Sequence, residues 1–355
     1  MYRNSFRLTN REIDEAFASG QLHLAYQPKL EMASGRAIGV ECFARWQHPA
    51  FGTIPPALFL PVFARQGRNE ELTRFVLATA IREAATWRGA RAQWTVSVNV
   101  SPDELADGTL PVSMRLALSA QDLAPQRLVV DLPERGLAAD PARAAATVHA
   151  LSEIGTGLAL DCSPEPHLDL GPAAGARPAG LDMTAFQELK IGGTAMMRFA
   201  SRIGPTGIGL VHDRLAFAAR HGLMATAVGA ETAETLLSLR RLGFTRIQGN
   251  AIGAAMPGEA LDGFDGPGTL ASLFATLETP PTSQAPTGET SEPRSARVRV
   301  VRGNARVALV SDSGEGTGPG RRILRLTAPR PDAPRAEGIV ARLQAGMARA
   351  LGLKA

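Results

Sequence analysis

The sequence is poor in cysteine and lacks long apolar runs. Its 355 residues include only two cysteines, Cys42 and Cys162, which excludes a disulfide-stapled scaffold and fits a reducing cytoplasm. No apolar run approaches the roughly 20 residues needed to cross a bilayer, so no transmembrane segment is predicted. The first seven residues lack the apolar core of a secretion signal. We therefore expect a cytoplasmic, globular protein.

Acidic and basic residues are unevenly distributed along the chain. Residues 294–355 hold 13 basic and 4 acidic residues, a charge of +9. The remainder has 38 − 13 = 25 basic and 34 − 4 = 30 acidic residues, a charge of −5. The basic tail is suited to an acidic protein partner, an anionic lipid surface or nucleic acid. It contains no Phe, Tyr or Trp, which disfavours single-strand binding by base stacking.

Apolar runs alternate with helical patterns through most of the chain. Strands are predicted over residues 22–30, 37–43, 95–100, 128–132, 157–160, 186–191, 223–228 and 246–252. Helices are predicted over residues 10–17, with Asn10 as the cap, and over 56–64, 70–87, 141–154, 210–221 and 233–242. Strands that alternate with helices indicate parallel βα units and an α/β fold.

Polar residues stand where several of the predicted strands end. Glu41, Asn99, Asp131 and Asp161 each follow an apolar run, and Lys190 lies in another. Because a barrel gathers the carboxyl ends of its strands at one face, we expect these side chains to form one site. Carboxylate and amide oxygens suit Mg²⁺ or Mn²⁺, and a pair of such ions can hydrolyse a phosphodiester.

The order and spacing of these residues resemble the EAL family, the cyclic-di-GMP phosphodiesterases of bacterial signalling, from about Thr9 to Pro257. The resemblance implies a TIM-barrel-like α/β fold with one antiparallel strand. The motifs that carry it are Tyr26-Gln27-Pro28, Gly39-Val40-Glu41-Cys42-Phe43-Ala44-Arg45-Trp46, Ser97-Val98-Asn99-Val100-Ser101, Leu189-Lys190-Ile191, Glu231-Thr232-Ala233-Glu234 and Ile247-Gln248-Gly249.

The resemblance also implies roles for particular residues. It gives Lys190 the orientation of the attacking water and makes Glu231 a second catalytic residue. The positions that would contact the base and phosphate of cyclic-di-GMP are Gln27, Arg45 and Gln248. The ligands of the first Mg²⁺ or Mn²⁺ would be Glu41, Asn99, Asp131 and Asp161, of which Asp131 replaces a Glu.

The chain departs from the family where the second metal would be held. Cys162 and Val228 replace the two carboxylates there. Valine has no lone pair, and a thiol prefers softer metals than Mg²⁺. Gly192 also replaces an Asp, and Ser163-Pro164-Glu165-Pro166 stands in place of a glycine-rich lid, which stiffens that loop. The sequence therefore predicts a degenerate member with negligible hydrolysis.

Beyond the barrel we expect less regular structure. We divide the chain into an N-terminal extension (1–8), a barrel domain (9–262), a flexible linker (263–295) and a basic tail (296–355) with short strands and a C-terminal helix. Pro, Thr, Ser and Glu dominate residues 278–293, a composition that cannot bury a core. One face of the predicted C-terminal helix is apolar and suited to a partner helix or to the barrel itself. It consists of Ile339, Val340, Leu343, Met347 and Leu351.

Three functions remain open on the sequence. The first is a degenerate EAL regulator that acts through protein contact, with or without bound cyclic-di-GMP. The second is a weak phosphodiesterase that yields linear pGpG and uses one metal, since Lys190, Glu41, Asn99 and Asp161 are retained. The third is a nucleic-acid or membrane module in which the barrel is a scaffold for the basic tail.

Overall fold

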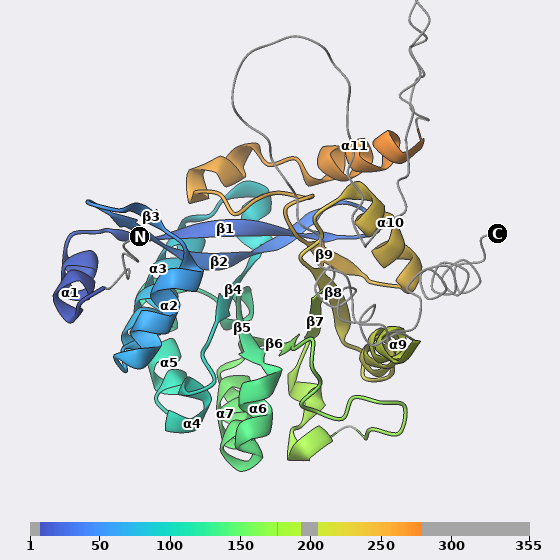
Figure 1. Ribbon diagram of the computed structural model, residues 1–355, viewed down its shortest axis with the longest axis horizontal. Coiled ribbons are helices and arrows are strands. Elements are labelled where there is room, and N and C mark those ends of the chain that lie inside the picture. Colours follow the sequence, from blue (N-terminus) through green and yellow to red (C-terminus); the bar gives the residue numbers. More distant parts are fainter. Residues whose placement is uncertain (1–7, 176, 193–204, 279–355) are drawn as a thin grey trace, which may run out of the picture. The chain divides into compact units, whose positions relative to one another are not determined.

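The computed structural model describes residues 8–175, 177–192 and 205–278 (Figure 1). The predicted tail over residues 296–355, and all but the last residue of the predicted N-terminal extension, lie outside this part. Among the described residues, no helix combines the length and apolarity that crossing a bilayer requires.

Eight strands close into a barrel. β1 (Leu22–Glu31) pairs antiparallel with β2 (Ala37–His48) on one side and with β9 (Arg246–Gln248) on the other. The barrel pairings that run from β2 to β4 and then in order through β5, β6, β7 and β8 to β9 are parallel. The predicted TIM-barrel-like fold with one antiparallel strand is confirmed. The other barrel strands are β4 (Thr95–Asn99), β5 (Leu128–Pro133), β6 (Gly157–Cys162), β7 (Glu188–Gly192) and β8 (Met224–Val228).

A short strand that the sequence reasoning missed, β3 (Gly52–Ile54), forms a hairpin with the end of β2. Helices surround the barrel (Figure 1). They are α1 (Asn10–Ala18), α2 (Pro56–Arg65), α3 (Asn69–Thr86), α4 (Glu104–Asp107), α5 (Leu110–Gln121), α6 (Glu134–Ala139), α7 (Pro141–Ile154), α9 (Pro205–Arg220), α10 (Ala233–Leu242) and α11 (Gly266–Glu278). The expected cap of the first helix shifts by one residue, because Thr9 and Glu12 form a reciprocal capping box there.

The barrel strands separate an apolar outer face from a polar axis. On β5, Leu128, Val130 and Leu132 are fully buried, and they alternate with Asp131, whose carboxylate contacts Lys190 of β7. Successive side chains of a strand point to opposite faces. The apolar set therefore packs toward the helices, and the polar set lines the interior.

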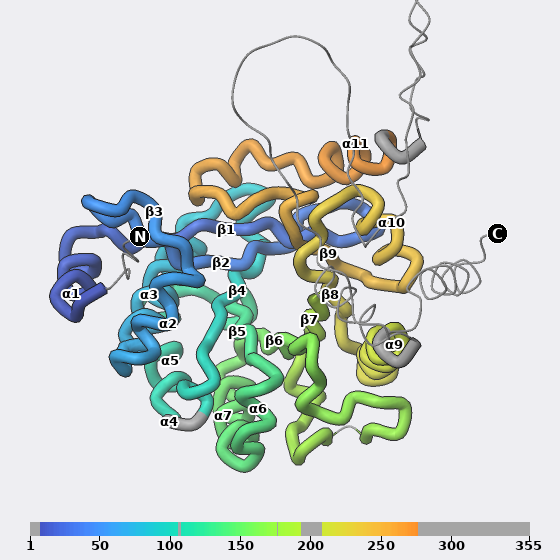
Figure 2. The backbone as a smooth tube through the Cα atoms, in the orientation of Figure 1, coloured from blue at the N-terminus to red at the C-terminus, as the bar shows by residue number. Residues whose placement is uncertain are grey.

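The connection between β6 and β7 is irregular (Figure 2). Its described residues contain two short 3₁₀ turns, η3 (Pro178–Gly180) and η4 (Met183–Ala185), and no α-helix. Four buried apolar side chains cover this part of the barrel in place of a helix; they are Leu168, Leu170, Leu181 and Met183.

The predicted flexible linker is wrong for residues 266–278, which form α11. Asp265 accepts a hydrogen bond from the Gly268 amide at 3.0 Å and so caps the helix. Leu270 is buried, and the Arg240 guanidinium of α10 lies 5.3 Å from the centroid of the Phe274 ring. The Pro-, Thr-, Ser- and Glu-rich composition on which the linker prediction rests belongs to residues 278–293 and does not extend over this helix. The apolar face of the helix packs on the barrel domain.

Candidate functional site

Lys190 lies at the centre of the candidate site. Its Nζ donates hydrogen bonds of 2.7 Å to Glu41 Oε2 and of 2.7 Å to Asp131 Oδ2. The three side chains come from β7, β2 and β5, and each is at least 95% buried. Charge-assisted hydrogen bonds of this length are strong. The structure therefore brings together the predicted water-orienting lysine and two of the predicted metal ligands.

Three amide side chains extend this cluster. Asn99 donates to Glu41 Oε1 at 2.6 Å, and Gln248 donates to Glu41 Oε2 at 2.9 Å. The same Gln248 amide lies 3.1 Å from Gln27 Oε1. Glu41 thus accepts bonds from one ammonium and two amides. Two of the three predicted ligand-contacting residues, Gln27 and Gln248, belong to this network.

Asn250 connects Glu231 to the same network. Its Nδ2 donates to Glu231 Oε2 at 3.0 Å, and its Oδ1 accepts from Gln27 Nε2 at 3.3 Å. Sequence reasoning missed Asn250. The available signal was its position two residues beyond Gln248, just after the last strand.

The structure places Arg45 apart from this cluster. Among its described contacts, the guanidinium donates to the Ala44 carbonyl at 3.0 Å and lies 5.5 Å from the centroid of the Phe43 ring. Arg45 and Glu41 are four residues apart on β2 and so share a face of the strand. The guanidinium is therefore on the same face as the cluster but does not contribute to its hydrogen bonds.

Burial and charge act in opposite directions on the ionisable groups of the cluster. Burial would lower the pKa of Lys190, but Asp131 and Glu41 outweigh it and hold that pKa well above its usual range. Burial would raise the pKa of Glu41, but Lys190 and Asn99 outweigh it and keep that pKa low. Burial dominates at Asp131 and raises its pKa to about 7 despite Lys190. The pKa of Asp161 is also raised by burial.

The donor set suits one hard cation. Glu41, Asn99, Asp131 and Asp161 offer only oxygen as ligand atoms, which Mg²⁺ and Mn²⁺ prefer. Asp131 Oδ1 is buried and finds no hydrogen-bond partner among the residues that the structure describes, so it is available to a cation. When bound, such an ion would neutralise charge on a phosphate. In the described part of the chain, no three His, Cys, Asp or Glu side chains are already arranged to hold a metal ion.

The two altered positions do not suit a second hard cation. Val228 ends β8 opposite Gln248 and two residues beyond Thr226, whose hydroxyl bonds Glu188 inside the barrel. By alternation its alkyl side chain faces the interior at the strand ends. Cys162 follows Asp161 as the last residue of β6. Burial raises the pKa of its thiol further above neutrality, so it is not a thiolate.

A second buried ion pair lies along the barrel axis from the cluster. Lys29 Nζ contacts Glu188 Oε1 at 2.8 Å, and both side chains are at most 3% exposed. Thr226 Oγ1 donates to the same carboxylate at 2.6 Å. Burial would raise the pKa of Glu188, but Lys29 and Thr226 outweigh it and lower that pKa to about 2. Sequence reasoning missed this pair, although Lys29 and Glu188 each lie two residues from a predicted site residue.

The Glu188 carboxylate is expected to make stability depend on acid pH. Its pKa is lower folded than unfolded, so its contribution is complete above pH 4.5 and is lost as the pH falls toward 2. We expect the free energy of unfolding in urea to lose about 2 kcal/mol from this group between pH 6 and pH 3. The double variant Lys29→Met, Glu188→Leu is the control. If its loss over this range equalled that of the unmodified chain, the assignment would be wrong.

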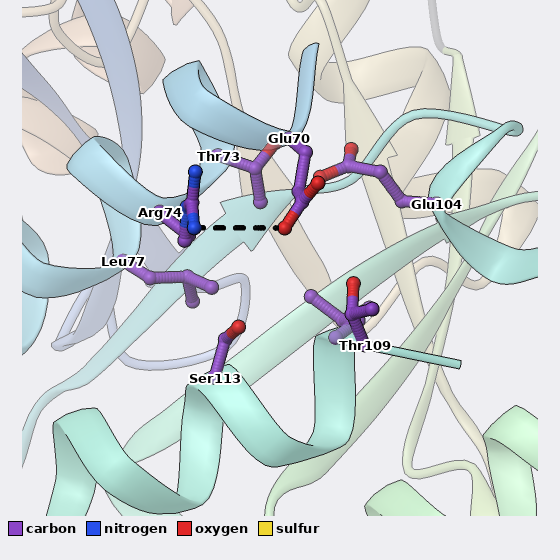
Figure 3. A pocket seen from close by; sticks show the side chains of 8 residues that line it. Glu70, Thr73, Arg74, Leu77, Glu104, Thr109 and Ser113 are labelled. Carbon is purple, nitrogen blue, oxygen red and sulfur yellow. Dashed lines mark ion pairs between the residues drawn. The ribbon is translucent and has the colours of Figure 1, made fainter. Parts of the chain in front are cut away.

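A separate crevice between α3 and α5 is too small for a ligand (Figure 3). Its volume is about 10 Å³, roughly the room that one water molecule needs. An ion pair between Arg74 and Glu70, 3.7 Å apart, lies at its edge. None of its lining residues belongs to the Lys190 cluster.

A closed barrel with one antiparallel strand and a polar cluster at its strand ends defines a TIM-barrel protein with a candidate site for cations and anionic ligands. The pattern of the EAL domain matches residues 10–255, and the chain belongs to this family. The predicted family membership is confirmed.

The chain is similar to several signalling proteins. It is 31% identical over 251 residues to the bifunctional diguanylate cyclase/cyclic di-GMP phosphodiesterase MucR of Pseudomonas aeruginosa, covering 70% of this chain and 35% of that protein. It is 28% identical over 255 residues to the oxygen sensor protein DosP of Escherichia coli, covering 71% of this chain and 30% of that protein. The chain thus spans about a third of the length of these relatives.

Two solved structures illustrate the likeness. The PaMucR phosphodiesterase in its c-di-GMP complex matches with a TM-score of 0.62 at 30% identity, over 71% of this chain and 98% of that one. The FimX EAL domain from Pseudomonas aeruginosa, bound to c-di-GMP, matches with a TM-score of 0.57 at 20% identity, over 72% of this chain and 98% of that one. At this lower identity the second likeness shows the fold alone.

Proposed function

We propose that this chain is a degenerate EAL-domain regulator of bacterial signalling, which binds cyclic-di-GMP at the strand ends and hydrolyses it negligibly. We base this on two features that occur together: the Lys190 cluster is intact, and Val228 and Cys162 stand where the family has carboxylates. The cluster supplies polar groups for a nucleotide. Neither Val228 nor Cys162 offers a hard oxygen ligand for a second metal ion.

Retention of the ligand-facing amides supports the binding part of the proposal. Gln27 and Gln248 hydrogen-bond each other and lie within the Glu41 network. Within the described part of the chain, the printed contacts of the Arg45 guanidinium are with the Ala44 carbonyl and the Phe43 ring, and a guanidinium suits bidentate contact with a phosphate. The relative of 30% identity whose structure holds c-di-GMP supports the same ligand here.

A weak phosphodiesterase is the second candidate. Glu41, Asn99, Asp131 and Lys190 lie in one network, and no described residue hydrogen-bonds to Asp131 Oδ1. These residues would hold a single Mg²⁺ or Mn²⁺. A single ion lacks the partner that a two-metal site uses to stabilise both the attacking and the leaving oxygen, which favours binding over turnover.

Calorimetric titration with cyclic-di-GMP tests the proposed receptor. We expect saturable binding to the unmodified chain, and an affinity about 10-fold or more weaker in Arg45→Ala, because a charge-assisted phosphate contact is lost. Arg36→Ala is the matched control, since Arg36 lies in the turn outside the barrel and pairs only loosely with Glu31 at 4.0 Å. Absence of binding to the unmodified chain would contradict the proposal.

We further propose that a protein partner receives the signal. The unequal distribution of charge along the sequence supports this: the net charge is +9 over residues 294–355 and −5 over the rest of the chain. A basic segment of this kind suits an acidic partner or an anionic surface. The segment lies outside the described residues, so this proposal rests on sequence alone.

A further inference from the structure

One buried carboxylate holds the segment that follows β6. Glu134 begins α6 and is fully buried. Its Oε2 accepts from the Ser163 amide at 2.8 Å, and its Oε1 accepts from the amides of His167 and Leu168, each at 2.9 Å. The Glu134 side chain thus accepts hydrogen bonds from both ends of the segment formed by residues 163–168.

Because residues 163–168 include two prolines, the Glu134 carboxylate accepts hydrogen bonds from most of the backbone N–H groups in this segment. Two of its six residues, Pro164 and Pro166, have no amide hydrogen. Four backbone N–H groups remain, and three of them donate to Glu134. The prolines also restrict φ, so little conformational freedom is left. The sequence predicted a stiff loop here, and the hydrogen bonds to Glu134 add a second restraint.

Arg214 of α9 completes the restraint. Its Nη2 donates to Glu134 Oε2 at 2.9 Å and its Nη1 to the Ser163 carbonyl at 2.7 Å. The residue is 1% exposed and lies on the face of α9 that also buries Val211 and Ala218. A buried guanidinium is costly unless it is paired, and a leucine would fill this position without that requirement. The position therefore holds a cation where helix packing alone calls for an apolar residue.

The clamped segment directly adjoins the candidate site. Ser163 is two residues from Asp161, the penultimate residue of β6, whose partner in the strand register is Lys190 of β7. We propose that Arg214 is a positioning residue: acting through Glu134, it fixes residues 163–168 in one conformation and so sets the position of the Asp161 carboxylate. Residues 163–168 then keep the same conformation whether or not a ligand is bound. The effect on ligand affinity rests on the proposed receptor function, whereas the clamp itself does not.

Hydrogen–deuterium exchange of the full chain tests the clamp without any ligand. We expect the amides of Ser163, His167 and Leu168 to be protected in the unmodified chain. In Arg214→Leu they should exchange about 10- to 100-fold faster, because a charged hydrogen bond to the shared acceptor is lost. Protection elsewhere, for example in β4, should not change. Equal protection of the three amides in a folded Arg214→Leu chain would overturn the proposal.

Arg220 provides the matched control on the same helix. It donates to the carbonyls of Gly171 and Pro172, further along the same connection. Arg220→Leu should leave exchange at residues 163–168 unchanged. Should Arg214→Leu fail to fold, Arg214→Lys keeps the cation but loses the planar fork that spans two acceptors. Faster exchange confined to residues 163–168 is expected there too, and unchanged exchange would again overturn the clamp.

Titration of the same variants with cyclic-di-GMP separates the two proposals. If the clamp positions the site, Arg214→Leu should weaken binding about 10-fold while Arg220→Leu does not. Failure of the unmodified chain to bind, together with accelerated exchange in Arg214→Leu, would reject the receptor function and keep the clamp. Accelerated exchange with unchanged affinity would reject the positioning role, because the segment would then be only structural.

Discussion

Hydrolysis of cyclic-di-GMP in Mn²⁺ is expected to rise by about 100-fold or more when Cys162→Asp and Val228→Glu are introduced together. Each change supplies a carboxylate at a position where the family resemblance places a ligand of the second metal. Removal of a general base or an equivalent group typically costs a factor of about 100 to 10,000 in rate, so restoring two such groups should recover at least the lower figure. Linear product is measured at saturating substrate.

The control for this prediction keeps size and removes charge. Cys162→Asn with Val228→Gln places amides where the carboxylates would stand, and hydrolysis should stay at the level of the unmodified chain. An equal gain in the amide variant would mean that packing, not metal ligation, limits the rate. No gain in the carboxylate variant would show that these two positions are not what disables the site.

Removal of the Lys190 ammonium is expected to cause a large fall in the free energy of unfolding. Lys190→Met leaves the carboxylates of Glu41 and Asp131 buried without the cation that pairs them. Breaking a buried pair from one side costs about 3–5 kcal/mol. We expect the free energy of unfolding in urea to fall by that amount at pH 8.

The pH dependence of this variant gives an internal check. Burial raises the pKa of Asp131 to about 7 even beside Lys190, and loss of that cation raises this pKa further. At pH 5 the Asp131 carboxyl of the variant is therefore neutral, and one of the two unpaired charges is removed. The loss caused by Lys190→Met should therefore be smaller at pH 5 than at pH 8. Arg177→Met, which breaks an exposed pair with Asp182, should change little at either pH. A pH-independent loss in Lys190→Met would contradict the assigned charges.

The barrel and most of its cluster could be predicted from the sequence because they rest on local patterns. Short apolar runs mark the strands, and parallel strands place their ends together, so the sequence alone predicts that Glu41, Asn99, Asp131 and Lys190 share one site. The antiparallel first strand followed from the family resemblance rather than from periodicity.

The contacts that sequence reasoning missed join residues far apart along the chain. Lys29 and Glu188 are separated by 159 positions, and Glu134 and Arg214 by 80. Each of these residues looks like an ordinary charged residue in its own segment. Only the closure of the barrel and the packing of α9 bring the partners together. The helix α11 was missed because the linker prediction covered residues 263–295, whereas packing on the barrel domain stabilises a helix there.

One titration distinguishes a receptor from an enzyme most directly: cyclic-di-GMP binding and linear-product formation are recorded in the same sample, with Mn²⁺ present. For a degenerate receptor we expect saturable binding with turnover below about 0.01 s⁻¹, against about 1–10 s⁻¹ for an ordinary enzyme. Turnover near the ordinary range would contradict it, as would the absence of both binding and turnover.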